Sequence, residues 1–376
     1  MEKNNKTLNV PNLRFPEFSG EWESVRLGDV CKFFSGGTPS STNKDFYDGD
    51  IPFIRSGEIH SSSTELYISE AGLNSSSAKI IEQGDLLLAL YGATSGDIAI
   101  SKIKGAINQA ILCIRTNHDN FFLKSCWEKH CRKLLQTYLQ GGQGNLSADI
   151  VKSIKISFPS CLEQKKISGL LALVEERIET QKKIIEDLKK LKDAISCKNL
   201  FDQSWKEYKV SEISILGRGR VISTIEISRQ ERPQYPVYSS QTSNNGIMGY
   251  LDDYDFDGEY ITWTTDGANA GTVFYRNGRF NCTNVCGTIK VNKNIDAYFL
   301  SVVLQSATAK YVSINLANPK LMNNTMASIK VKLPDIDTQK YWSRILQHID
   351  KKIDTEFKYE SLLIQQKIYL LSQLFI

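Results

Sequence analysis

The sequence predicts an α+β protein in which two homologous domains with mainly β cores are separated by two long antiparallel coiled-coil helices. The fold is therefore expected to carry a pseudo-two-fold internal repeat. The first observation is a duplication: SIKISFPSCLEQK at Ser153–Lys165 is matched by SIKVKLPDIDTQK at Ser328–Lys340, 175 residues later. In the same way, WESVRLGDV at Trp22–Val30 is matched by WKEYKVSEI at Trp205–Ile213. The second observation is a run of apolar residues at coiled-coil spacing after each repeat. A unit this long indicates two domains, because solenoid repeats span about 20–50 residues.

Five segments follow from this duplication. A chain of 376 residues is too long for one ordinary core and suits two domains of about 130–140 residues plus connecting elements. We expect an N-terminal extension at 1–20, a first domain at 21–160, a first long helix at 161–201, a second domain at 202–334 and a second long helix at 335–376.

Each domain contains short apolar runs between segments rich in Gly, Ser, Thr and Asn, which is typical of β-strands. In the first domain these runs are Ile51–Arg55, Asp85–Tyr91, Ile98–Ile100 and Ile107–Ile114, followed by a helical pattern at Asn120–Leu139. In the second they are Tyr235–Tyr238, Tyr260–Trp263, Gly271–Tyr275 and Gly287–Val291.

The long helices are predicted by apolar steps of four and three residues. The first stripe contains Ile167, Leu171, Val174 and Ile178, and the second contains Trp342, Leu346, Ile349 and Ile353 at the same 175-residue offset. Such a stripe needs a partner, and the nearest candidate is the other helix. About 38 residues of helix would span roughly 57 Å at 1.5 Å per residue.

Composition places few limits on function. The formal charge is +4, from 46 basic and 42 acidic residues, so any surface for nucleic acid must come from local clustering. The longest apolar stretch, Asp85–Tyr91, is too short for a membrane span, and the N-terminus has no secretory h-region. The eight cysteines lack zinc-site spacing, so we expect free thiols in a reducing cytoplasm and no metal site.

The sequence lacks the motifs of the enzymes that act on DNA with S-adenosylmethionine or ATP. A DNA-adenine methyltransferase needs Asn/Asp-Pro-Pro-aromatic, and the nearest segment, Asn318–Lys320, lacks it. The sequence has no phosphate-binding loop of the Gly-x-x-x-x-Gly-Lys-Ser/Thr type. We therefore expect no catalytic residues on this chain.

Several motifs together resemble one protein family. Pro159–Ile167 (PSCLEQKKI) begins a long helix, Leu370–Phe375 (LLSQLF) ends another, Gly141–Ser147 joins a domain to its helix, and Leu13–Trp22 opens the chain. This duplicated arrangement resembles the specificity subunit of type I restriction–modification enzymes over essentially the whole chain. The second signature departs from the first: only Gln339 matches Gln164, and Thr338 stands in the place of Glu163.

The resemblance implies a division of labour among subunits. Each domain would be a target recognition domain that reads one half of a bipartite, gapped site on double-stranded DNA, and each helix would be a spacer. Two DNA-adenine methyltransferase subunits and two restriction/translocase subunits would be the partners, in the cytoplasm. The S-adenosylmethionine, ATP and Mg would belong to those partners, so this chain would hold no cofactor.

Base-contacting residues can be ranked only by chemistry. Arg, Lys, Asn and Gln read base edges, while Lys, Arg, Ser and Thr hold phosphates. The candidates in the first domain are Lys44, Arg55, Tyr91, Asn108, Gln109, Gln143 and Asn145; those in the second are Arg218, Arg220, Gln241, Asn245 and Trp263. The plain alternative for each is a solvated turn or a capping residue, and for Trp263 a core position. The alternative function is a two-domain coiled-coil adaptor that binds protein partners only.

Overall fold

The computed structural model describes residues 9–138, 146–199, 204–313 and 318–376, apart from the side chains of 131–138 and 197–199. The chain divides into two compact units. Unit 1 takes in the chain up to Lys182 together with Lys358–Ile376, and unit 2 is Lys183–Phe357. Each long helix therefore contributes to both units, whereas the segments expected from the sequence assign each helix to a segment of its own. Among the described helices, none is long and apolar enough to cross a membrane.

The described residues of unit 1 form three sheets. A two-stranded sheet pairs β1 (Glu23–Arg26) with β10 (Lys155–Phe158). A four-stranded sheet has the order β2 (Cys31–Ser35), β9 (Ile111–Thr116), β6 (Leu86–Ala89), β7 (Ile98–Ile100). A second four-stranded sheet has the order β4 (Tyr67–Ile68), β3 (Tyr47–Ile54), β8 (Gly105–Ile107), β5 (Lys79–Ile81). The helices that belong to unit 1 alone are α1 (Leu27–Val30), α2 (Glu70–Asn74), α3 (Asn120–Tyr138) and α4 (Ala148–Ser153), with 3-10 turns η1 (Lys44–Phe46), η2 (Ser56–Glu58) and η3 (Gly92–Thr94).

Unit 2 repeats this topology. Strands β11 (Lys206–Lys209) and β19 (Lys330–Leu333) pair as β1 and β10 do. The four-stranded sheet has the order β12 (Ser214–Arg218), β18 (Cys286–Val291), β15 (Tyr260–Thr264), β16 (Val273–Arg276). The smaller sheet has the order β14 (Ile247–Leu251), β13 (Tyr235–Tyr238), β17 (Asn281–Cys282). The helices that belong to unit 2 alone are α6 (Val210–Ile213), α7 (Thr224–Ser228), α8 (Ala297–Ala307) and α9 (Asn323–Ser328), with η4 (Ser243–Gly246) and η5 (Thr308–Tyr311).

The apolar runs of the sequence form the central strands. All four residues of β6, LLLA, are buried, because this strand lies inside its sheet and is covered on both faces. The run Ile107–Ile114, expected as one strand, is instead two: β8 ends at Ile107, the chain turns at Asn108–Ala110, and β9 joins a different sheet. A short polar turn inside an apolar run thus moves the chain from one sheet to the other.

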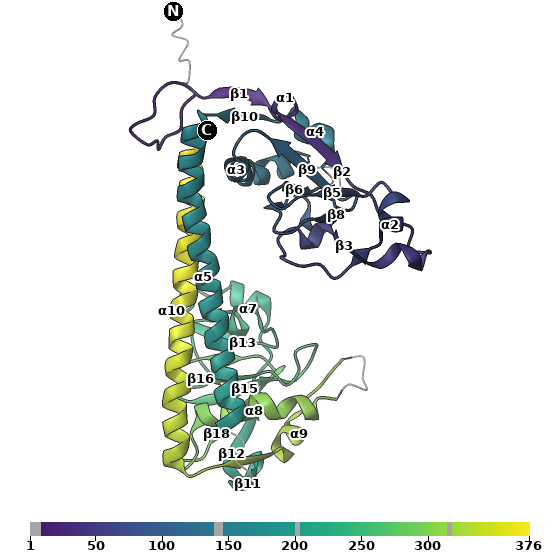
Figure 1. The fold of residues 1–376 in the computed structure, drawn as a ribbon. Helices are drawn as coiled ribbons and strands as arrows, with labels where there is room; N and C mark the ends of the chain where they lie inside the picture. The colour runs from purple at the N-terminus through teal and green to yellow at the C-terminus, as the bar shows by residue number, and fades with distance from the viewer. Residues whose placement is uncertain (1–8, 139–145, 200–203, 314–317) are drawn as a thin grey trace, which may run out of the picture. The chain divides into compact units, whose positions relative to one another are not determined.

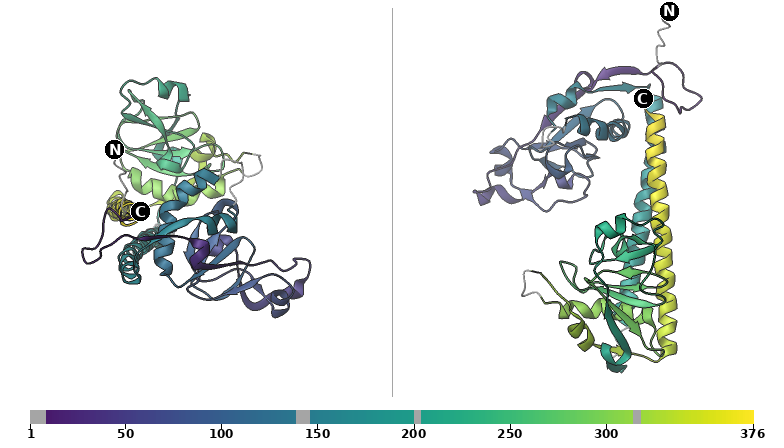
Figure 2. Two further views of the ribbon diagram at one scale, coloured as in Figure 1. Left: turned by 90° about the horizontal axis from the view of Figure 1, so that it is seen from above. Right: turned by 180° about the vertical axis from the view of Figure 1, so that it is seen from behind.

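The two long helices, α5 (Cys161–Asn199) and α10 (Ile336–Leu374), each contain 39 residues and lie side by side in Figures 1 and 2. In unit 1, Val174 and Ile178 of α5 form a buried cluster with Leu363 of α10. In unit 2, the Lys189 amine lies 4.7 Å from the centre of the Phe357 ring. The start of one helix packs with the end of the other in unit 1, and the reverse holds in unit 2, so the pairing is antiparallel. The expected fold class is confirmed.

Interhelical ion pairs follow the sequence repeat. Lys367 lies 2.7 Å from Glu175 in unit 1, and Lys192 lies 2.6 Å from Asp350 in unit 2. Adding 175 to Glu175 gives Asp350, and adding 175 to Lys192 gives Lys367. Each helix therefore contributes an acid to one unit and a lysine to the other, which is what an antiparallel pair of homologous helices requires.

Candidate nucleic-acid interface

In both units, three equivalent segments meet at one end of one sheet, which is β2-β9-β6-β7 in unit 1 and β12-β18-β15-β16 in unit 2. In unit 1 the Leu90 N–H donates to the Ala110 carbonyl oxygen (2.8 Å), and the Leu146 N–H donates to that of Leu90 (2.9 Å). In unit 2 the bonds recur at the 175-residue offset: Thr265 N–H to Val285 (3.0 Å) and Leu321 N–H to Thr265 (3.0 Å). We call these places the loop edge of unit 1 (residues 36–39, 90–97 and 108–110) and the loop edge of unit 2 (residues 219–221, 265–272 and 283–285).

Glycines let the chain cross the sheet at these edges. A Cβ on Gly36, just after β2, would lie 1.7 Å from the carbonyl oxygen of Ile107. A Cβ on Gly219, just after β12, would lie 2.0 Å from that of Cys282. Only glycine allows such an approach of two backbones. These glycines therefore serve packing, and they place the polar residues beside them on the loop edge.

The loop edge of unit 1 gathers three of the sequence candidates. The Thr38 hydroxyl donates to Gln109 Oε1 (2.6 Å), which joins the first loop to the β8–β9 turn. Asn108 Oδ1 accepts from the Ala110 N–H (3.1 Å) and so stabilises that turn. Tyr91, at the start of η3, exposes 40% of its surface. Tyr91, Asn108 and Gln109 thus lie on one polar edge.

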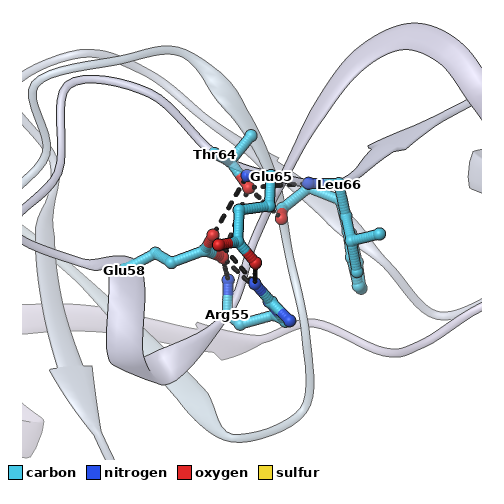
Figure 3. Close-up of polar contacts among 6 residues, drawn as sticks. Arg55, Glu58, Thr64, Glu65 and Leu66 are labelled. Atoms are coloured by element: carbon cyan, nitrogen blue, oxygen red, sulfur yellow. Dashed lines mark hydrogen bonds and ion pairs between the residues drawn. The ribbon is translucent and has the colours of Figure 1, made fainter. Parts of the chain in front are cut away.

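Lys44 and Arg55 lie outside this edge, just before and just after strand β3 of the β4-β3-β8-β5 sheet. Lys44 is exposed at the start of η1. Figure 3 shows the Arg55 guanidinium facing two carboxylates. Its nitrogens donate to both oxygens of Glu58 (3.0 Å each) and to Glu65 (2.7 Å). These bonds raise the pKa of Arg55 and lower that of Glu58 to about 2. The Arg55 guanidinium is thus paired with two carboxylates of its own chain, and these contacts hold the β3–β4 connection.

The two arginines of the GRGR loop differ in their surroundings. Arg218 Nε donates to the Asn284 carbonyl oxygen (2.5 Å) and Nη2 donates to Thr265 Oγ1 (3.1 Å). Both contacts belong to the loop edge of unit 2, and within the described residues no carboxylate pairs with Arg218. Arg220 instead lies 2.7 Å from Glu226 and 3.1 Å from Asp255. The hydrogen bond to Glu226 is the main cause of its raised pKa. Arg218 is therefore the arginine whose charge is available to a phosphate or a guanine.

Gln241 and Asn245 lie in the turn between β13 and β14. Gln241 donates its side-chain amide to the carbonyl oxygen of Ile247, across the turn. Asn245 has a φ of 52° and is exposed. Gln241 therefore stabilises the turn, and Asn245 is presented by it.

The candidate Trp263 is wrong, because its side chain lies in the core. Its side chain is 0% exposed, and its indole N–H donates to the Leu321 carbonyl oxygen (2.9 Å) inside the core of unit 2. A buried, hydrogen-bonded indole on a central strand offers no face to a base. Gln143 and Asn145 lie outside the described residues.

Sequence reasoning missed two residues of this region. Asn284 aligns with the candidate Gln109 at the 175-residue offset, so the internal repeat could have identified Asn284 as a candidate. Arg276 ends β16 and is 4% exposed. An arginine at the end of an apolar strand carries no sequence signal that distinguishes it from a surface residue. Among the described residues no group of three or more His, Cys, Asp or Glu side chains is placed to hold a metal ion.

Comparison with known proteins identifies the family. The model for the type I restriction modification DNA specificity domain matches residues 19–190 and 202–362. Two Mycoplasma pneumoniae proteins named as type I specificity subunits are similar in sequence. One, described as an N-terminus, is 47% identical over 39% of this chain and 76% of its own length. The other is 37% identical over 53% of this chain and 84% of its own length.

The fold matches as well. The crystal structure of a type I restriction–modification S subunit from M. genitalium superposes with a TM-score of 0.67, covering 98% of this chain and 99% of that one at 17% identity. Two matched domains account for both halves of the duplication. The chain therefore belongs to the family of type I restriction–modification DNA specificity subunits.

Proposed function

We propose that each unit reads one half of a gapped, two-part DNA site through its loop edge and the neighbouring turns. The repeated loop edge carries this proposal, because the same backbone bonds bring equivalent loops together in each unit. Two homologous modules suit a target with two halves, as symmetric dimers suit operators with two half-sites. Family membership favours DNA recognition over the alternative of an adaptor for protein partners alone.

In this proposal catalysis belongs to partner subunits. Two DNA-adenine methyltransferase subunits would bind S-adenosylmethionine, and two restriction/translocase subunits would bind ATP and Mg, all in the cytoplasm. Support comes from large apolar side chains exposed along the long helices: Leu173, Leu191, Leu362 and Tyr369 are each 50–61% exposed. These side chains are available to a protein partner that packs along the helices.

Methylome sequencing tests the function. Cells would carry the gene for this chain, a gene for a type I DNA-adenine methyltransferase subunit, both or neither. We expect an adenine-methylated, gapped two-part motif only when both genes are present. A motif that persists without this chain, or no motif with both genes, would contradict the proposal.

Salt dependence supplies an independent test of DNA binding. Contacts to phosphates release counterions, so the logarithm of the binding constant should fall linearly with the logarithm of the salt concentration. A protein-only adaptor would show no such slope with DNA.

A further inference from the structure

A buried arginine without a carboxylate partner lies behind the β13–β14 turn. Arg276 is 4% exposed, and within the described residues it forms no ion pair. Its guanidinium carbon lies 3.6 Å from the centre of the Tyr238 ring and 4.4 Å from that of Phe274. Burying a cation without an anion is costly, so the cation–π contacts and hydrogen bonds must offset that cost.

The hydrogen bonds of Arg276 point to the turn. Nε donates to Thr262 Oγ1 (3.2 Å), and Nη2 donates to the carbonyl oxygen of Asn245 (2.9 Å). The Ser239 N–H closes the turn by donating to the Gly246 carbonyl oxygen (2.9 Å). Gln241 spans the turn by its bond to Ile247. An exposed turn is thus held from the inside at several points.

The turn presents two asparagine amides. Asn244 and Asn245 have φ angles of 48° and 52°, and both are exposed. Within the described residues neither side-chain amide makes a hydrogen bond. Asparagine matches the N7 acceptor and N6 donor of adenine in the major groove. Asparagine also tolerates the left-handed conformation, for which glycine would serve equally well.

The equivalent connection in unit 1 is held in another way. Strand β3 pairs antiparallel with β4 and parallel with β8, as β13 pairs with β14 and β17. The β3–β4 connection is held by Arg55 with Glu58 and Glu65 (Figure 3). The residue at the position of Arg276 in unit 1 is Ser101, by the 175-residue offset. Each unit therefore uses its own arginine to fix a topologically equivalent connection, although the sequences of these connections differ.

We propose that the β13–β14 turn (residues 239–246) reads an A·T base pair of the second half-site through Asn244 and Asn245, with Arg276 as the positioning residue that holds the turn. This inference rests on the proposed function. Arg276 acts through the turn and does not itself touch the base.

The test uses full-length chain and duplexes that carry the wild-type motif or single-base changes in either half. The double variant Asn244→Gly/Asn245→Gly removes both amides and keeps the left-handed backbone. We expect discrimination at one A·T pair of the second half-site to fall about tenfold, the contribution of a good bidentate contact. Discrimination in the first half-site should stay unchanged.

Arg276→Met should reduce discrimination at the same A·T pair, because the turn loses the hydrogen bond from Arg276 to the Asn245 carbonyl oxygen. Arg279→Met is the matched control: this arginine is exposed, lies just beyond β16 and pairs with Asp257 (3.3 Å). It loses the same charge and should leave discrimination at that pair unchanged. Thermal unfolding of all variants distinguishes loss of the fold from loss of base discrimination. If Arg276→Met does not fold, the Asn244→Gly/Asn245→Gly variant still tests the proposal.

The outcomes are distinct. A wild-type chain that prefers no gapped motif would overturn the proposed function and this inference together. If the wild-type chain prefers a gapped motif and the glycine variant discriminates equally well in the second half-site, this inference alone would be overturned. The asparagines would then be needed only for the backbone conformation of the turn. Equal loss of base discrimination in both half-sites would also overturn it, and so would a loss of discrimination confined to G·C pairs.

Discussion

Gln164 and Gln339, 175 residues apart, make the same two hydrogen bonds at the start of the two long helices. Gln164 donates to the Pro159 carbonyl oxygen (2.9 Å) and accepts from the Asp119 N–H (3.1 Å). Gln339 donates to Pro334 (2.9 Å) and accepts from Asp296 (3.0 Å). Both side chains are 1% exposed. This bond pair gives the glutamine a structural role in both repeats: it ties each helix start to a domain of its own unit.

Gln164→Leu should lower the free energy of unfolding by about 1–3 kcal/mol, because it leaves a buried N–H and a buried carbonyl without a partner. Gln339→Leu should do the same in unit 2. Denaturant unfolding measures both. Gln365→Leu, at an exposed position of α10, is the control and should change stability by less than about 0.5 kcal/mol. Equal effects of Gln164→Leu and Gln365→Leu would show that the two bonds contribute nothing.

The interhelical pair Lys192–Asp350 should obey a charge-swap test. Lys192→Glu should destabilise the chain by about 1 kcal/mol, a modest value because the Asp350 side chain is 36% exposed. Lys192→Glu combined with Asp350→Lys should recover part of the loss, and a double-mutant cycle with both single variants gives the coupling energy. A coupling energy of zero would mean that the Lys192–Asp350 pair does not stabilise the pairing of the helices.

Stability at low pH should depend on the Arg55–Glu58 pair. Hydrogen bonds from Arg55 lower the pKa of Glu58 from 4.5 to about 2. A depressed carboxyl pKa stabilises the fold above the unfolded value and loses that contribution as the pH falls through the folded value. The stability difference between wild type and Glu58→Gln should therefore be full at pH 6 and shrink between about pH 4.5 and 2. Glu21→Gln, at an exposed carboxylate of the same unit, is the control; a pH-independent difference for Glu58→Gln would refute the linkage.

Features of the fold and of the candidate site could be predicted where they depend on local sequence, and not where they depend on contacts between residues distant in sequence. The duplication and the heptads fixed the two domains and the antiparallel helices, because a constant offset and an apolar period are properties of the chain alone. Tyr91, Asn108 and Gln109 were found because they lie in turns. Trp263 was misjudged, since burial depends on what packs across a strand. Arg276 was missed for the same reason, and the sequence did not reveal that Arg55 and Arg220 face carboxylates while Arg218 does not.

Arg218 and Arg220 should therefore differ in DNA binding. Arg218→Ala should weaken preference at the second half-site, leave the first half-site intact and reduce the salt slope of binding by about 1 if Arg218 contacts a phosphate. Arg220→Ala should act mainly on stability, because it leaves Glu226 and Asp255 facing one another. Competition binding over a salt series and thermal unfolding separate the two effects. Equal changes in binding by both variants would contradict the assignment.

The length of the long helices should set the number of unread base pairs between the half-sites. Both α5 and α10 contribute residues to both units, so an insertion must be made in each helix to keep their pairing. Seven residues inserted after Lys182 and seven after Phe357 preserve the heptad seam. They add about 10.5 Å at 1.5 Å per residue, which corresponds to roughly three base pairs at 3.4 Å each. Methylome sequencing should then show both half-sites unchanged and the gap about three base pairs longer. A matched variant with the same heptad inserted in α5 alone breaks the register with α10 and should lose the motif. If the paired insertion keeps the wild-type gap, the helices do not measure the distance between the half-sites.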